Sequence, residues 1–181
     1  LSHALPDVIP AASQGTMNNL IVGGYDSIRG KPFSYYETIG GGSGGGPLAP
    51  GVDGIQVAMT NTRNTPIEAL ELAYPLLVKR YELRRGSGGR GFHAGGSGII
   101  RELVALVPSV ATVVTERRLR RPWGSGGGHS GNRGLNKVTR RGGKTQKLPG
   151  KTTLSLEAGD RIRIDTPGGG GWGCPTKPVK S

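Results

Sequence analysis

The sequence is poor in the residues that build a large core or a cross-linked fold. Only 34% of its 181 residues are hydrophobic, 5% are aromatic, and the one cysteine is Cys174. A single cysteine excludes a disulfide within the chain, which favours a reducing, cytoplasmic setting. No run approaches the roughly 18 apolar residues that a membrane-spanning helix needs, so no membrane association is predicted. Residues 1–3 begin neither a basic segment nor a long apolar one, so no signal peptide is predicted.

Glycine, by contrast, is abundant, with 34 residues. Glycine loses the most backbone entropy on folding and adds no side chain to a core. The glycines follow no collagen period, and the apolar segments are too well formed for a low-complexity chain. We therefore expect a piece that folds against something larger.

The chain also has few acids, 12 against 24 lysines and arginines, and they are unevenly placed. Residues 1–78 hold three basic and six acidic residues, a net charge of −3, and the remainder holds 21 basic and six acidic residues, a net charge of +15. A basic half can attract nucleic acid, an acidic membrane face or an acidic partner subunit. Its few aromatic residues are separated, which does not favour nucleic-acid binding by base stacking.

Hydrophobic patterns predict an α+β, β-rich fold of mostly antiparallel strands, with one short capped helix near 66–73 and long glycine-rich loops. Pro108 and Ser109 predict a hairpin turn between two of the strands. The expected strands are Leu20–Val22, Phe33–Ile39, Ile55–Thr60, Leu76–Leu83, Ile99–Val107, Ala111–Glu116, Thr152–Leu156 and Arg161–Ile164.

Composition divides the chain into three regions. Residues 1–78 form a glycine-rich active-site segment with the short helix, residues 79–173 a basic β-rich region, and residues 174–181 a disordered tail.

The start of the predicted helix is the first candidate site. Thr65 fits the N-cap, Pro66 the first helical position, and Glu68 closes a capping box. A helix N-terminus suits a carboxylate or phosphate, and Arg63 lies just before it. Arg63 either handles such an anion or only pairs with a surface acid.

Two motif fragments do not carry the chemistry that they suggest. Gly143–Thr145 and Gly150–Thr152 resemble the end of a phosphate-binding P-loop, but Val138 and Thr145 stand where the required first glycine should be. Gly41–Gly45 matches the nucleophile elbow around Ser43, but no helix follows it before Pro47. Neither a P-loop nor a serine nucleophile is predicted.

The three histidines, His3, His93 and His129, stand far apart and have no acidic ligand at metal-binding spacing. A metal site made by this chain alone is therefore not predicted. The glycine run Gly40–Gly46 has two open interpretations: backbone amides that cradle an anion, or crowded geometry that no Cβ fits.

A series of motifs in a fixed order resembles the C-terminal third of the hydantoinase B/oxoprolinase family. The resemblance runs from about Ala4 to Gly173 and does not single out a substrate. It rests on Ala11–Asn19, Tyr35–Gly42, Thr60–Pro66, Tyr74–Leu83, Gly95–Glu102, Leu148–Gly150 and Thr166–Gly173.

The resemblance implies an ATP-dependent hydrolase that opens a cyclic amide, 5-oxoproline or a hydantoin, with a hydantoinase A-type subunit that binds ATP and Mg²⁺. It also implies a divalent metal on the N-terminal portion of the B-type subunit, in motifs resembling DPYxGGxHxxD and HHxDxGG. Neither motif occurs here. This chain should therefore be part of a larger B-type subunit and inactive alone.

The resemblance also implies roles for the matched residues. Arg63 would neutralise an anionic substrate or acyl-phosphate, because a guanidinium pairs two oxygens at once. Glu37 would be a general acid or base, or else a buried, paired carboxylate. The residues that would bind substrate are Asn61, Asn64, Gly40, Gly41 and Gly42.

Two other functions stay open at this point. A ketone carboxylase of the acetone or acetophenone type has the same family resemblance. A basic, glycine-rich protein that binds RNA or another anion would need no partner subunit at all.

Overall fold

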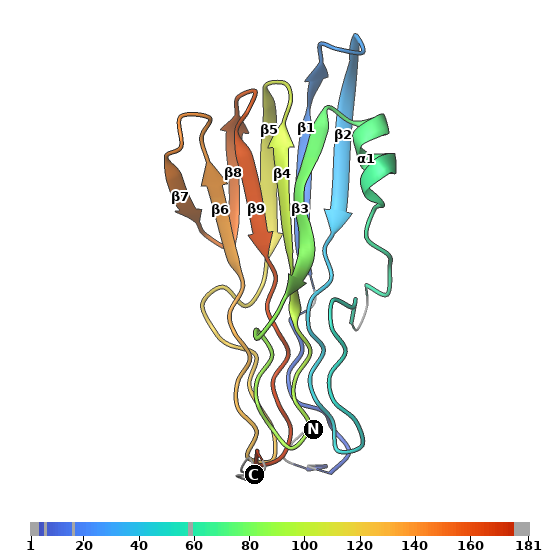
Figure 1. Ribbon diagram of the computed structural model, residues 1–181, viewed down its shortest axis with the longest axis vertical. Helices are drawn as coiled ribbons and strands as arrows, with labels where there is room; N and C mark the ends of the chain where they lie inside the picture. The colour runs from blue at the N-terminus through green and yellow to red at the C-terminus, as the bar shows by residue number, and fades with distance from the viewer. Residues whose placement is uncertain (1–3, 6, 16, 58–59, 176–181) are drawn as a thin grey trace, which may run out of the picture.

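The computed structural model describes residues 4–5, 7–15, 17–57 and 60–175. In this part of the chain it contains nine strands and one short helix. Figure 1 shows a long, narrow molecule, with the strands at one end and extended glycine-rich segments at the other. The predicted β-rich, antiparallel fold with a single short helix is confirmed.

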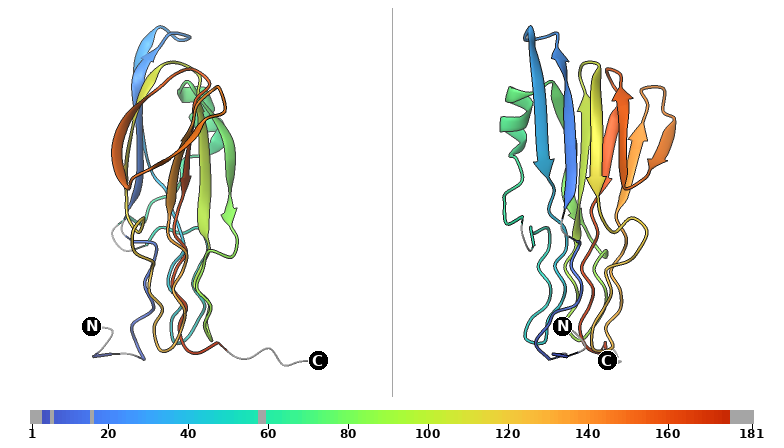
Figure 2. Two further views of the ribbon diagram at one scale, coloured as in Figure 1. Left: turned by 90° about the vertical axis from the view of Figure 1, so that its left-hand side faces the viewer. Right: turned by 180° about the vertical axis from the view of Figure 1, so that it is seen from behind.

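The strands form two antiparallel sheets that face each other as layers of a sandwich (Figure 2, left). The first sheet has the order β2-β1-β5-β8, made of β1 (Asn18–Asp26), β2 (Lys31–Thr38), β5 (Ser109–Thr115) and β8 (Lys151–Leu156). The second has the order β3-β4-β9-β6-β7, made of β3 (Leu76–Arg84), β4 (Gly98–Ala105), β9 (Arg161–Asp165), β6 (Leu135–Thr139) and β7 (Thr145–Leu148).

The core lies between the two sheets, because every second side chain of a strand points inward. In β9, Ile162 and Ile164 are buried while Arg161 and Arg163 remain partly exposed, so the predicted alternation is confirmed. The apolar core also includes Leu20, Val22, Tyr35, Ile39, Leu70, Leu76, Ile99, Leu103, Ala111, Val113, Val138 and Leu156.

The predicted hairpin at Pro108 and Ser109 is wrong. Strands β4 and β5 lie on either side of these residues, but β4 pairs with β3 and β9, and β5 pairs with β1 and β8. The connection crosses from one layer of the sandwich to the other. A proline turn signals a change of direction, but it does not determine whether the next strand joins the same sheet.

Two further differences concern strands. Ile55 makes only an isolated bridge with Gly41, so the strand predicted over Ile55–Thr60 is not formed at residues 55–57 and 60, and residues 58–59 lie outside the described part. The hairpin of β6 and β7 was not predicted, because its strands are short and polar. The fragment Gly143–Thr145, rejected above as a P-loop, lies at its turn and the start of β7.

The helix α1 (Ile67–Ala73) confirms the predicted position but not the predicted cap. Its N-cap is Pro66, and no side chain caps it, so the capping box of Thr65 and Glu68 is wrong. The backbone N–H of Thr65 instead donates to the Glu37 carboxylate, 2.9 Å away. Tyr74 ends the helix in an extended conformation, as expected before a proline.

The glycine-rich end consists of extended segments that pack side by side, here called the glycine bundle (residues 10–15, 40–54, 86–97, 122–134 and 166–173). Residues 166–173 make backbone hydrogen bonds to three of the other segments. Gly169 N–H donates to Gly96 O, Gly170 N–H to Ala12 O, and Gly171 N–H to His129 O. A Cβ added at any of these three glycines would come within 3.0 Å of a neighbouring backbone. Glycine is needed here for close packing, as at the axis of collagen.

The predicted regions 1–78 and 79–173 do not form separate layers of the sandwich. Residue 78 lies inside β3, and the first sheet combines β1 and β2 with β5 and β8. The predicted tail lies outside the described residues from 176 onward. The one helix of the described part is far too short to cross a membrane.

Candidate functional site

The candidate site lies where the sandwich meets the glycine bundle. Strand β2 ends at Thr38, and the chain continues into the glycine run, while the segment that leads to α1 returns to the same level (Figure 1). Asn61 and Arg63 are exposed on this segment, whereas Asn64 and Thr65 are partly buried. The first two side chains are thus open to a ligand, and the next two residues anchor the segment.

Both backbone groups of Thr65 are held by one buried ion pair. Glu37 Oε1 accepts the N–H of Thr65 at 2.9 Å, and Arg101 Nη2 donates to the carbonyl of Thr65 at 3.1 Å. Arg101 and Glu37 are also joined to each other, Nε to Oε2 at 3.2 Å and Nη2 to Oε1 at 3.4 Å. We call Glu37 and Arg101 the clamp pair.

The clamp pair is shielded from water. The side chains of Arg101 and Glu37 are 0% and 2% exposed. Tyr35 donates its hydroxyl to Glu37 at 2.5 Å, and the Tyr81 ring lies 4.4 Å from the Arg101 guanidinium. Burial, together with the neighbouring Glu37 charge, raises the pKa of Tyr35, so the tyrosine stays a hydrogen-bond donor. Removing one member of such a pair would leave an uncompensated buried charge.

This geometry bears on the two interpretations of Glu37. Both carboxylate oxygens accept hydrogen bonds, from Tyr35, Thr65 and Arg101. Glu37 is therefore the buried, paired carboxylate of the second interpretation. A role in general acid or base catalysis stays a prediction.

Asn64 connects the segment to three other parts of the molecule. Its Oδ1 accepts from Gly40 N–H and from Gln56 Nε2, both at 3.3 Å, and its Nδ2 donates to Tyr81 Oη at 3.0 Å. Since Tyr81 also stacks on Arg101, Asn64 belongs to the same network as the clamp pair. Its amide is thus engaged within the chain, and contact with a substrate stays a prediction.

The predicted glycines lie beside this network, but their amides have partners in the protein. Gly40 N–H donates to Asn64, Gly41 N–H to Ile55 O, and Gly42 N–H to the carbonyl of Pro167. A Cβ on Gly40 would lie 2.9 Å from the Gly54 carbonyl oxygen. The crowded-geometry interpretation thus describes these glycines, and an amide cradle for an anion would need these hydrogen bonds to be replaced.

Arg101 and Tyr81 were not singled out in the sequence, although a signal for Arg101 exists. Ile99, Arg101 and Leu103 occupy alternate positions of β4, and all three are buried. An arginine in the inward phase of an apolar strand needs a buried acid, because an unpaired buried charge is very costly. This rule points to Glu37 as a candidate partner of Arg101.

The histidines give no metal site in the described part of the chain. His93 Nδ1 lies 2.7 Å from the carbonyl oxygen of Gly46, and His3 is outside the described residues. No three His, Cys, Asp or Glu side chains within those residues come together to hold a metal ion.

Comparison with known proteins gives one family and a fold. The family model described as hydantoinase B/oxoprolinase matches residues 1–175. A 5-oxoprolinase of Arabidopsis thaliana is 47% identical over 163 residues, which are 90% of this chain but only 12% of that relative. The chain thus spans a small fraction of the relative's length.

Two solved structures have the same fold. The ATP-dependent caprolactamase from Pseudomonas jessenii aligns with a TM-score of 0.80 and 26% identity, over 96% of this chain and 31% of that one. An ATP-dependent acetone carboxylase aligns with a TM-score of 0.72 over 90% of this chain and 26% of the other. At 16% identity, the second likeness extends to the fold alone.

Proposed function

The chain belongs to the hydantoinase B/oxoprolinase family, and from this premise we propose that it is the C-terminal part of a B-type subunit in an ATP-dependent cyclic-amide hydrolase. The observation that carries the proposal is the 47% identity to a 5-oxoprolinase over 90% of the chain. The caprolactamase supports the same substrate class, because 5-oxoproline and caprolactam are both lactams. A hydantoin ring contains the same kind of amide bond.

The remainder of the enzyme lies outside this chain. A hydantoinase A-type subunit supplies ATP with Mg²⁺, and the N-terminal portion of the B-type subunit supplies a divalent metal, in a cytoplasmic assembly. The small share of each relative that the chain covers supports this division.

Arg63 is the residue of this chain best placed to act on the substrate. Its side chain is exposed, next to Asn61, and the following residues are fixed by the clamp pair. Ring opening of an amide activated by phosphorylation develops negative charge on oxygen. A guanidinium stabilises that charge by pairing with two oxygens, provided that it is held in position beforehand.

The test uses the complete B-type polypeptide with its A-type partner. ATP-dependent opening of 5-oxoproline, hydantoin and caprolactam would be measured as ADP and ring-opened product. Arg63→Ala should lower kcat at least about 100-fold, as for loss of one oxyanion donor, and leave the assembly intact. Arg85→Ala, on an exposed arginine after β3, is the matched control and should retain activity.

The outcomes separate the functions. Opening of any of these rings by wild type, lost in Arg63→Ala, supports the proposal. Wild-type rates in Arg63→Ala remove Arg63 from the site. No ring opening, but bicarbonate-dependent consumption of acetone, would replace the hydrolase by a carboxylase.

A further inference from the structure

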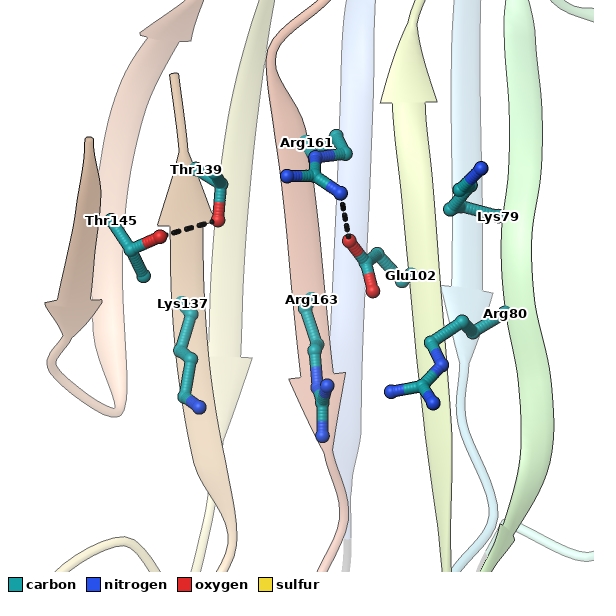
Figure 3. Close-up of a pocket in the computed structure, with 8 residues that line it drawn as sticks. All are labelled: Lys79, Arg80, Glu102, Lys137, Thr139, Thr145, Arg161 and Arg163. Carbon is teal, nitrogen blue, oxygen red and sulfur yellow. Dashed lines mark hydrogen bonds and ion pairs between the residues drawn. The ribbon is translucent and has the colours of Figure 1, made fainter. Parts of the chain in front are cut away.

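The outer face of the second sheet carries a row of cations that the candidate site does not use. In the register of the sheet, Lys147 of β7 lies opposite Lys137 of β6, and Lys137 lies opposite Arg163 of β9. Arg163 in turn lies opposite Glu102 of β4, and Glu102 opposite Arg80 of β3. Directly opposite residues share one face, with Cβ atoms about 5 Å apart. Figure 3 shows Lys137, Arg163 and Arg80 ending at one level across three strands.

A bulge in β3 enlarges this face. The pairing register of β3 shifts between Val78 and Arg80, so Lys79 and Arg80 both line the same hollow of about 440 Å³. Without the bulge, two successive residues would point to opposite sides of the sheet. We call Lys79, Arg80, Lys137, Lys147, Arg161 and Arg163 the cationic face.

The arginines of this face have acidic partners, and the lysines do not. Arg80 pairs with Glu82 at 3.4 Å, Arg161 with Glu102 at 3.4 Å, and Arg163 with Asp165 at 2.6 Å. Within the described part of the chain, no acid lies within ion-pair distance of Lys79, Lys137 or Lys147. The face therefore has an excess of three positive charges, all of them on lysines.

Like charges that lie directly opposite in a sheet are destabilising. Lysines on an edge strand can protect that edge from aggregation, which would account for Lys147 on β7. It does not account for Lys137 and Arg163, because β6 and β9 are inner strands. An anionic group from outside the chain would remove the repulsion.

The chemistry of the face favours an extended acidic protein surface over a small anion or a nucleic acid. The row crosses five strands, roughly 19 Å at the usual strand spacing. Small-molecule sites are concave and mostly apolar, whereas this hollow is lined only by charged and threonine side chains. No aromatic side chain lines it, so stacking with bases has no platform.

We propose that the cationic face docks an acidic surface of the ATP-binding partner subunit, an identity of the partner that rests on the proposed function. Complementary charges on two protein surfaces raise the rate of association and fix the orientation of the partners, and salt weakens this attraction. The six residues that define the face are all charged, so an interface built on them is polar, which fits separate subunits that meet reversibly.

Charge reversal tests the proposal. The double variant Lys137→Glu/Lys147→Glu, in the complete B-type polypeptide, should associate with the partner at least tenfold more slowly in 50 mM salt. This difference should shrink in 500 mM salt. Lys31→Glu/Lys151→Glu changes the net charge equally on exposed lysines of the first sheet and should slow association less than twofold.

Thermal unfolding separates docking from folding. Glutamate at 137 would face Arg163, so the double variant should melt no lower than wild type while it binds more slowly. Wild-type association rates in the double variant would overturn the proposal.

A second probe covers the case in which wild type does not bind the A-type subunit, which would contradict the proposed function. A ten-residue polyglutamate peptide would then be titrated into each polypeptide. Binding to wild type and the control, lost in the double variant, would support an acidic ligand for this face. Equal binding to all three, or preferential binding of single-stranded RNA to the face, would overturn it.

Discussion

Adding one methyl group at Gly45 should open the glycine bundle locally. A Cβ built on Gly45 lies 2.5 Å from the carbonyl oxygen of His93 and 3.0 Å from that of Ala94. Ordinary contact begins at 3.4 Å, so the two backbones must separate by roughly 0.9 Å. Gly45 N–H donates to Gly170 O at 2.9 Å, and Ala11 N–H donates to Gly45 O at 2.8 Å. Shifting Gly45 away from His93 by this amount would distort both hydrogen bonds, because they join Gly45 to two other segments of the bundle.

The expected loss for Gly45→Ala is about 3 kcal/mol, since each buried backbone group left unpaired costs about 1–3 kcal/mol. This corresponds to a roughly 100-fold drop in hydrogen-exchange protection for amides of the bundle. Gly142→Ala is the matched control, because no atom lies within 4 Å of its added Cβ, and it should be neutral or slightly stabilising. Hydrogen exchange followed by mass spectrometry on the complete polypeptide measures both. Exchange of the bundle within twofold of wild type in Gly45→Ala would refute the packing argument.

Two further predictions concern buried charges. Glu37→Gln should lower the free energy of unfolding by about 3–5 kcal/mol in urea, because Arg101 keeps its buried charge. Glu37→Leu/Arg101→Met removes both charges but leaves Tyr35 and Thr65 without these partners, so it should restore part of the stability and none of the turnover. Equal turnover in that double variant and wild type would contradict a positioning role. Burial raises the pKa of Asp160, but hydrogen bonds from Glu157 N–H, Arg140 and Arg141 N–H lower it below its usual value overall. The Asp160 carboxylate therefore stabilises the fold fully above the pKa that it has in the unfolded chain, and this stabilisation is lost as the pH falls through its pKa in the folded protein. The difference in urea midpoint between wild type and Asp160→Asn should accordingly narrow below about pH 4. A difference that stays constant from pH 7 to pH 3 would contradict this assignment.

Local pattern was enough to predict most of the strands. Arg161–Ile164 alternates with period two, as the inward and outward positions of a strand do. β2 and β3 were predicted close to their observed bounds without such alternation, β2 from its aromatic residues. Pairing is a different matter. β5 pairs with β1 and β4 pairs with β9, both of them strands far away in sequence, so Pro108 and Ser109 could not reveal that the chain changes sheets there.

The sequence predicted the position of the candidate site but not the hydrogen bonds that hold it in place. Thr65 has the sequence features of an N-cap, yet its backbone N–H is taken by Glu37, and that carboxylate is held by Arg101, 64 positions away. A local rule such as the capping box cannot include a partner at that distance. The glycine runs were likewise recognised as unusual, but their close packing depends on which segments become neighbours.

Stability alone does not explain why the protein has the buried ion pair of Glu37 and Arg101. Well-packed apolar residues in place of a buried ion pair are often as stable or more so, because both charges must leave water. Apolar side chains, however, could not hold the N–H and the carbonyl of Thr65 at once, as Glu37 and Arg101 do. What the pair adds is a fixed backbone next to the exposed Arg63. The proposed role of Arg63 requires such fixing, because a guanidinium that stabilises a developing oxyanion must be held in one orientation beforehand.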